Sequence, residues 1–167
     1  IMDLMTGMWA AVGVLAALAR RQETGEGEYI DLAMLDVMVA TIANQGMNYL
    51  VSGKTPQRMG NKHPNIQPQD VFDCTDGKMV LAVGNDGQFA SFCQAMGHPE
   101  VAQDERFSTN RARVVNLSAL MEFVSGEIGK RSRQECIAAL RKHGVPCGPI
   151  NTIPEILADP QIVHRQM

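Results

Sequence analysis

The hydrophobic pattern divides the chain into a long apolar stretch, a polar connecting segment and a region of shorter amphipathic elements. Residues 4–19 are almost continuously apolar, with a single carboxylate, Asp3, directly before them and Arg20-Arg21 directly after them. An acidic group at the start and basic groups at the end complement a helix dipole. We therefore predict a buried helix over residues 3–22, with Asp3 as its N-cap and Gly25 as its C-terminal stop.

The next elements are shorter and end in a loop. Residues 29–32 predict a short strand, and apolar side chains recur at helical spacing between about 33 and 50. From residue 53 to 68 the chain has Gly, Pro and Asn without apolar periodicity, which predicts a loop. The sequence therefore indicates a boundary near residue 52.

The region after this loop alternates strands and helices. Two apolar segments, 71–74 and 79–83, flank Asp76-Gly77, a pattern typical of an antiparallel hairpin. Helices are expected over 86–96, with Asp86 as its cap, over 108–130 and over 133–142, and a short last helix is expected to open at 152. Ser132 with Glu135, and Thr152 with Glu155, have the spacing of capping boxes. The predicted fold class is α/β in two unequal parts.

Composition and charge exclude several function classes. Hydrophobic residues make up 45% of the 167 residues, and the net charge is −3, so no basic field indicates nucleic-acid binding. The four cysteines lack C-x-x-C spacing, which favours free thiols in a cytoplasmic protein over zinc or disulfides. The apolar run of 16 residues is shorter than the roughly 18 expected of a membrane span. No basic stretch precedes it, which argues against a signal peptide.

Asp3 has two interpretations on local chemistry alone. Capping explains a carboxylate at the start of a helix without any further function. The alternative is a nucleophile, since an ionised carboxylate at the edge of an apolar core can form a covalent acyl intermediate.

A set of short motifs, in order along nearly the whole chain, bears on this choice. They include Asp3-Leu4-Met5-Thr6-Gly7-Met8, Gly60-Asn61-Lys62-His63-Pro64-Asn65-Ile66 and Gly144-Val145-Pro146-Cys147-Gly148-Pro149, together with segments 13–18, 24–27, 30–36, 76–77, 84–89 and 158–161. The ordered set resembles the family III CoA-transferases of the CaiB/BaiF type, the carnitine, bile-acid and formyl-CoA transferase group.

The resemblance implies a reaction and site residues. Asp3 stands where the family has its catalytic nucleophile, which would carry first an acyl anhydride and then a CoA thioester. The loop 58–68, with Gly60, Asn61, Lys62 and His63, stands where relatives have the segment that borders the active site and closes over the intermediates. Coenzyme A is then a substrate, with no metal and no redox cofactor. The Asn-x-His-Pro form favours a dicarboxylic acid acceptor, with Arg58 and Lys62 as carboxylate partners.

The resemblance also implies an architecture. Residues 1–52 would be a helix–strand–helix piece from the C-terminal part of a Rossmann-like large CoA-binding domain, and 53–167 a small α/β domain with an antiparallel hairpin, followed by the start of a return segment. Relatives form interlocked homodimers. Because the chain begins at Ile1 with a motif already under way, we expect a fragment that lacks the N-terminal half and its CoA-binding residues, and that is inactive alone.

Two alternatives stay open. The first is an α-methylacyl-CoA racemase of the same superfamily, because Asp86 lies near the place of the racemase carboxylate. The second is a non-catalytic fragment that only folds or assembles with a partner. The chain also departs from many relatives at Gln69, where they have a tyrosine after the second proline.

Overall fold

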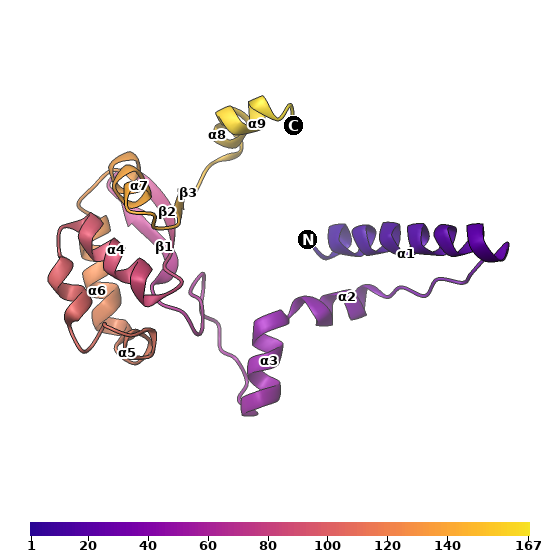
Figure 1. Ribbon diagram of the computed structural model, residues 1–167, viewed down its shortest axis with the longest axis horizontal. Coiled ribbons are helices and arrows are strands. Elements are labelled where there is room, and N and C mark those ends of the chain that lie inside the picture. Colours follow the sequence, from indigo (N-terminus) through magenta and orange to yellow (C-terminus); the bar gives the residue numbers. More distant parts are fainter. The chain divides into compact units, whose positions relative to one another are not determined.

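The computed structural model describes residues 1–167 and divides into two compact units. We call Ile1–Arg58 the helical unit and Met59–Met167 the sheet unit. Figure 1 shows the helical unit as a set of helices and the sheet unit as a small sheet with helices beside it.

The helical unit folds back on itself. Helix α1 covers Met2–Thr24, α2 covers Met34–Thr41 and α3 covers Ala43–Ser52. The extended segment between α1 and α2 returns along α1. There the Ile30 side chain fills the space beside Gly13, and a Cβ added to this glycine would lie 3.4 Å from Ile30 Cγ2. Helix α1 ends as predicted at Gly25, whose left-handed conformation (φ 76°) lets its N–H donate to the Arg21 carbonyl oxygen.

Three expectations for this unit were wrong. Asp3 is not the N-cap, because Ile1 occupies that position and its carbonyl oxygen accepts the first helical bond, from the Met5 N–H. Residues 29–32 form no strand, since no neighbouring strand offers them a hydrogen-bond ladder. The expected second helix is two helices. The Thr41 hydroxyl bonds back to the Val37 carbonyl oxygen, and Ala43 follows with a φ of 46°.

Helix α1 is exposed rather than buried within this chain. None of its 23 residues is buried, and Val37 of α2 is the one buried hydrophobic residue of the helical unit. The length and composition of α1 would suffice to cross a membrane, with a mean hydropathy of 1.6. The helix is longer than the apolar run of 16 residues from which the sequence predicted it to be too short for a membrane span. Core helices of soluble proteins meet the same criterion.

The sheet unit is built on a three-stranded antiparallel sheet of order β1-β2-β3. The predicted hairpin is confirmed: β1 (Gln69–Cys74) pairs with β2 (Gly77–Ala82), and Cys74 faces Gly77 across a two-residue turn. Strand β3 (Cys147–Pro149), which the sequence suggested only as an extended segment, pairs with β2 opposite Met79 and Leu81. The remaining elements are α4 (Asp86–Met96), η1 (Pro99–Gln103), α5 (Asn110–Val115), α6 (Leu117–Ile128), α7 (Arg133–Lys142), α8 (Ile153–Leu157) and α9 (Pro160–His164).

The core lies between this sheet and the helices. Helix α6 packs against β1, and α7 packs against β2, β3 and α4. Alternate residues of β2 point inward, so that Met79 and Leu81 are fully buried. Each of the main helices buries one face; the buried residues of α4, α6 and α7 include Phe89, Phe92, Cys93, Met96, Leu120, Val124, Ile128, Cys136 and Leu140.

Cap residues and spacing in the sequence predicted most helix ends of this unit, but the N-cap of α4 and a break in the helix over 108–130 were predicted wrongly. Both predicted capping boxes are present, at Ser132 and at Thr152. The N-cap of α4 is Asn85 and not Asp86, since the Asn85 side chain accepts the Gln88 N–H. The expected helix over 108–130 breaks at Asn116, whose side-chain amide donates to the Ala112 and Arg106 carbonyl oxygens.

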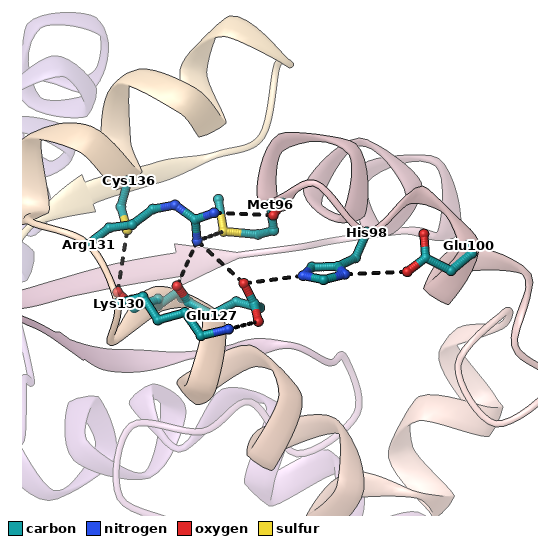
Figure 2. Close-up of polar contacts among 8 residues, drawn as sticks. Met96, His98, Glu100, Glu127, Lys130, Arg131 and Cys136 are labelled. Atoms are coloured by element: carbon teal, nitrogen blue, oxygen red, sulfur yellow. Dashed lines mark hydrogen bonds and ion pairs between the residues drawn. The ribbon is translucent and has the colours of Figure 1, made fainter.

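A polar cluster holds the end of α6 against the segment after α4 (Figure 2). Glu127 is buried and contacts Lys130, Arg131 (3.6 Å) and His98 (3.4 Å). Arg131 also donates to the Met96 carbonyl oxygen at 3.2 Å. A buried carboxylate is tolerated only when paired, and these contacts provide the pairing.

Candidate active site

Asp3 lies in the first turn of α1 and is exposed. Its carboxylate makes no hydrogen bond or ion pair, so it caps nothing and is free to react or to bind a ligand. Partial positive charge from the helix N-terminus favours an anion at this place. One turn later, the Thr6 hydroxyl oxygen is buried and has no hydrogen-bond partner. Buried groups without a hydrogen-bond partner are rare in folded proteins.

The four loop residues implied by the resemblance lie together in the sheet unit. Gly60 adopts a left-handed conformation (φ 66°), and the following turn brings the Lys62 N–H to 3.4 Å from the Met59 carbonyl oxygen. Asn61 and Lys62 are exposed, whereas His63 is half-buried. Asp3 belongs to the other unit, the helical one.

Hydrogen bonding assigns the tautomer of His63. Its ring Nδ1 accepts the backbone N–H of Asn65 at 3.1 Å, so the proton of the neutral imidazole is on Nε2. The backbone N–H of His63 donates to the Gln69 carbonyl oxygen at 3.1 Å. The histidine is thereby held with a hydrogen-bond donor at its outer nitrogen.

Gln67 is the buried centre of the loop. Its side chain is 1% exposed, donates to the His63 carbonyl oxygen at 2.6 Å and accepts the Gln69 N–H at 3.3 Å. Its backbone N–H donates to Asn110, and its carbonyl oxygen accepts from Arg113. Every polar group of this residue therefore fixes the loop to itself or to α5.

Arg113 is the fully buried cation behind this loop. Its guanidinium donates to the Gln67 carbonyl oxygen at 2.7 Å, to the Phe107 carbonyl oxygen at 2.8 Å and to the Asp86 carboxylate at 2.7 Å. It also lies 4.6 Å from the centre of the Phe89 ring. An arginine buried at 0% exposure needs this full set of partners, and Asp86 supplies the compensating charge.

Sequence reasoning missed Gln67, Asn110 and Arg113. Asn110 follows Thr109 and looks like part of an ordinary cap region, and Arg113 follows Arg106 and Arg111 with nothing in the sequence to mark it as the buried one. Only the tertiary contacts reveal that Gln67 is the buried centre of the loop and that Asn110 and Arg113 bind it. No local signal in the sequence could have found them.

A hollow beside Lys62 has an acidic lining. It has a volume of about 360 Å³ and is lined by Lys62, by Asp70 and Asp73 of β1, and by Met121 and Ser125 of α6. Asp73 is paired with Lys78 at 2.5 Å. Asp70 is the carboxylate left to offset Lys62, and this disfavours an anionic ligand inside the hollow. No cluster of three or more His, Cys, Asp or Glu side chains is arranged to hold a metal.

Comparison with known proteins covers the whole chain. The model of CoA-transferase family III matches residues 1–167. The chain is 45% identical over 165 residues to the succinate–glutarate CoA-transferase of Agrobacterium fabrum, and 36% identical over 165 residues to the acetyl-CoA:oxalate CoA-transferase of Acetobacter aceti. Among solved structures it matches a CaiB/BaiF family protein from Brucella suis with a TM-score of 0.79 and 46% identity.

These alignments each include 99% of this chain but a smaller share of the other protein. The chain spans 41% and 42% of the two curated relatives and 44% of the Brucella suis chain. Its mixed α/β fold, with the small three-stranded sheet, therefore matches part of a larger known structure. Because the family match extends from the first residue to the last, the chain belongs to CoA-transferase family III.

Proposed function

We propose that the protein carrying this chain transfers CoA from an acyl-CoA donor to a carboxylic acid acceptor, with Asp3 as the nucleophile. The observation that carries the proposal is the state of Asp3, an exposed carboxylate in the first turn of α1 that no other group engages. Family membership supplies the reaction class.

The proposed cycle uses this carboxylate twice. An Asp3 oxygen attacks the thioester carbonyl carbon, the carbon–sulfur bond breaks, and CoA leaves as a thiolate, so that Asp3 and the donor acid are joined in a mixed anhydride. The thiolate then attacks the Asp3 carbonyl carbon, which releases the donor acid and leaves a CoA thioester on Asp3. The acceptor carboxylate repeats the two steps in reverse, so that Asp3 is regenerated.

Two features of the chain suit the needs of this chemistry. The first helical bond of α1 runs from Met5 to Ile1, so the N–H groups of Asp3 and Leu4 lack an acceptor within the helix and can stabilise an oxyanion. Reactive anhydrides also require exclusion of water. We assign that task to the loop 58–68, with Gly60, Asn61, Lys62 and His63 facing the substrate.

We further propose a dicarboxylic acid as the acceptor. The names of both curated relatives include dicarboxylates, namely succinate and glutarate in one and oxalate in the other. A second carboxylate needs a cation, and Arg58 and Lys62 are the two exposed cations of the loop. Arg58 is the better candidate, because Asp70 and Asp73 line the hollow beside Lys62.

The wider architecture remains a proposal. We place residues 1–52 in a Rossmann-like large domain and residues 53–167 in a small domain, in a cytoplasmic, interlocked homodimer. The exposed apolar surface of α1 supports this, since a helix that is apolar nearly all round requires cover from other elements.

The racemase alternative is less well supported. Its carboxylate must be free to exchange a proton with the α-carbon of a thioester. The Asp86 carboxylate is instead bonded at 2.7 Å to the fully buried Arg113. Loss of its charge would leave that guanidinium without compensation.

Replacing Asp3 with asparagine tests the proposal in the native protein. Asn keeps the size and the polarity of the side chain but cannot form the anhydride, so we expect CoA transfer to fall by at least about a thousandfold. Stability should change by no more than about 0.5 kcal/mol, since only a first-turn charge is lost. Acyl-CoA followed by hydroxylamine should label Asp3 in the unsubstituted protein.

Four outcomes would contradict this assignment. Full transfer activity in Asp3→Asn, or a covalent label elsewhere, would exclude Asp3 as the nucleophile. Deuterium exchange into the α-carbon of a 2-methylacyl-CoA without an acceptor acid would indicate the racemase. Absence of any CoA-dependent reaction in the native protein would favour the non-catalytic alternative.

A further inference from the structure

The loop that carries the candidate substrate contacts is held by one asparagine outside it. Asn110, the first residue of α5, bonds the loop backbone at two points. Its Oδ1 accepts the Gln67 N–H at 3.0 Å, and its Nδ2 donates to the Asn65 carbonyl oxygen at 2.8 Å. One amide thus pairs with residues two apart, as a neighbouring strand would. Exchanging its oxygen and nitrogen would break both bonds.

This contact reaches His63 through Gln67. The Gln67 side chain, held in place by the bond from its own backbone to Asn110, donates to the His63 carbonyl oxygen at 2.6 Å. Asn65, whose carbonyl oxygen accepts from Asn110, donates its own backbone N–H to His63 Nδ1. Both the backbone and the ring of His63 therefore depend on the segment that Asn110 holds.

Asn110 itself stands on a fixed support. The Thr109 side chain caps α5 by accepting the Ala112 N–H at 3.2 Å, which sets the start of the helix. Three residues after Asn110, the fully buried Arg113 ties α5 to Gln67, to Phe107 and, through Asp86, to α4. Helix α5, and Asn110 with it, is therefore tied to the core of the sheet unit as well as to the loop.

We propose that Asn110 is a positioning residue that holds segment 63–67 in the conformation needed for transfer. The inference rests on the proposed function of the loop. A misplacement of about 1 Å in a group that positions substrate can cost about a hundredfold in rate. A loosened loop should also admit water to the anhydride, so that acyl-CoA is hydrolysed instead of passing CoA to the acceptor.

The test compares two asparagines in the native protein. Asn110→Ala removes both bonds to the loop. Asn116→Ala removes two bonds of the same kind, to the Ala112 and Arg106 carbonyl oxygens, which do not involve the loop. Asn110→Asp keeps the acceptor for Gln67 but loses the donor to Asn65, so its effect should be intermediate.

We expect the ratio of hydrolysis to transfer to rise about tenfold or more in Asn110→Ala and to stay within about twofold of the parent in Asn116→Ala. Amide hydrogen exchange should quicken at residues 63–67 in Asn110→Ala only, with Met79 and Leu81 of β2 unchanged. This second measurement does not depend on activity.

The outcomes separate the two proposals. Unchanged exchange at 63–67 in Asn110→Ala would overturn the positioning role, whatever the activity. Faster exchange with an unchanged hydrolysis ratio would overturn its link to transfer. A parent protein without transferase activity would overturn the proposed function, and with it the catalytic part of this inference. Equal losses in Asn110→Ala and Asn116→Ala would indicate a general loss of stability and would overturn the inference.

Discussion

At the scale of single residues, Gly77 joins the hairpin to α7 where no side chain fits. A Cβ at this position would lie 3.1–3.3 Å from the Arg133 guanidinium, and the φ of 150° is one that L-residues rarely adopt. Arg133 cannot move away without loss, because it donates to the Ile150 carbonyl oxygen and to Glu155. The Asp-Gly pattern predicted the turn, and the φ of 150° together with the packing against Arg133 explains why Gly77 is required.

We therefore expect Gly77→Ala to lower the free energy of unfolding by about 1–3 kcal/mol. Gly126, in the middle of α6 with nothing near its Cβ position, is the matched control. Gly126→Ala should raise stability by about 0.5–1 kcal/mol, since alanine favours a helix. Denaturant unfolding of the two variants measures both; destabilisation of equal size in each would contradict the packing argument.

Glu127 makes the stability of the sheet unit depend on pH (Figure 2). The hydrogen bond from Lys130, with further attraction from His98 and Arg131, lowers the pKa of the Glu127 carboxyl against the opposing effect of burial. Because the folded-state pKa is depressed, this stabilisation is present above the ordinary glutamate value of about 4.3. It is lost as pH falls through the folded-state pKa.

The free energy of unfolding, measured against pH for the parent and for Glu127→Gln, tests this pH-dependent stabilisation. The variant should be less stable than the parent near neutral pH, and the difference should vanish below the folded-state pKa of Glu127. Glu122→Gln, on the same helix but without an ion pair, should show no such pH dependence. A difference between Glu127→Gln and the parent that persisted at low pH would point to packing and not charge.

At the scale of elements, the two capping boxes are alike in bonding but differ in what they support. The side chains of Ser132 and Thr152 each accept the backbone N–H of the glutamate three positions later. The side chain of that glutamate in turn accepts the backbone N–H of the capping residue. Helix α7 buries Cys136 and Leu140, whereas α8 buries no residue. The same local motif is therefore coupled to the core in one helix and not in the other.

Removing each cap should separate global from local stability. Ser132→Ala should lower the free energy of global unfolding by about 1 kcal/mol, because α7 unfolds only with the core. Thr152→Ala should leave global unfolding nearly unchanged and quicken hydrogen exchange within α8. Equal shifts of the global transition would show that α8 is as firmly coupled as α7.

At the scale of the whole molecule, the two units differ in how completely they bury their apolar residues. The sheet unit encloses a continuous core, from Phe72 in β1 to Val145 before β3. The helical unit exposes large apolar side chains along α1, including Leu4, Trp9 and Leu15. Contiguous apolar surface of this kind marks a site of association.

We expect the chain of residues 1–167 to associate with increasing concentration in sedimentation velocity. Replacing Leu4 and Leu15 by lysine should shift it toward the monomer, because charged side chains resist burial. The same replacement at Val115, an exposed apolar residue of the sheet unit, is the control and should leave association unchanged. A monomer at all concentrations would contradict this expectation.

The sequence alone determined the local elements, the family resemblance and the candidate residues, because these depend on neighbours along the chain. Local signals identified the ranges of α4 and α7, and the spacing of cap and turn residues identified both capping boxes and the hairpin. The same signals failed where more than one residue could occupy the N-cap position of a helix. Asp3 and Asp86 each look like caps, yet Ile1 and Asn85 occupy those positions.

The tertiary structure decided what depends on contacts between distant residues. The ladder that makes residues 147–149 a strand joins them to β2, about seventy residues earlier. The support of the loop comes from Asn110 and Arg113, more than forty residues after it, and it turns Asp86 from a candidate base into the partner of a buried arginine. A buried charge requires partners wherever the fold provides them, and no spacing along the chain specifies which residues those are.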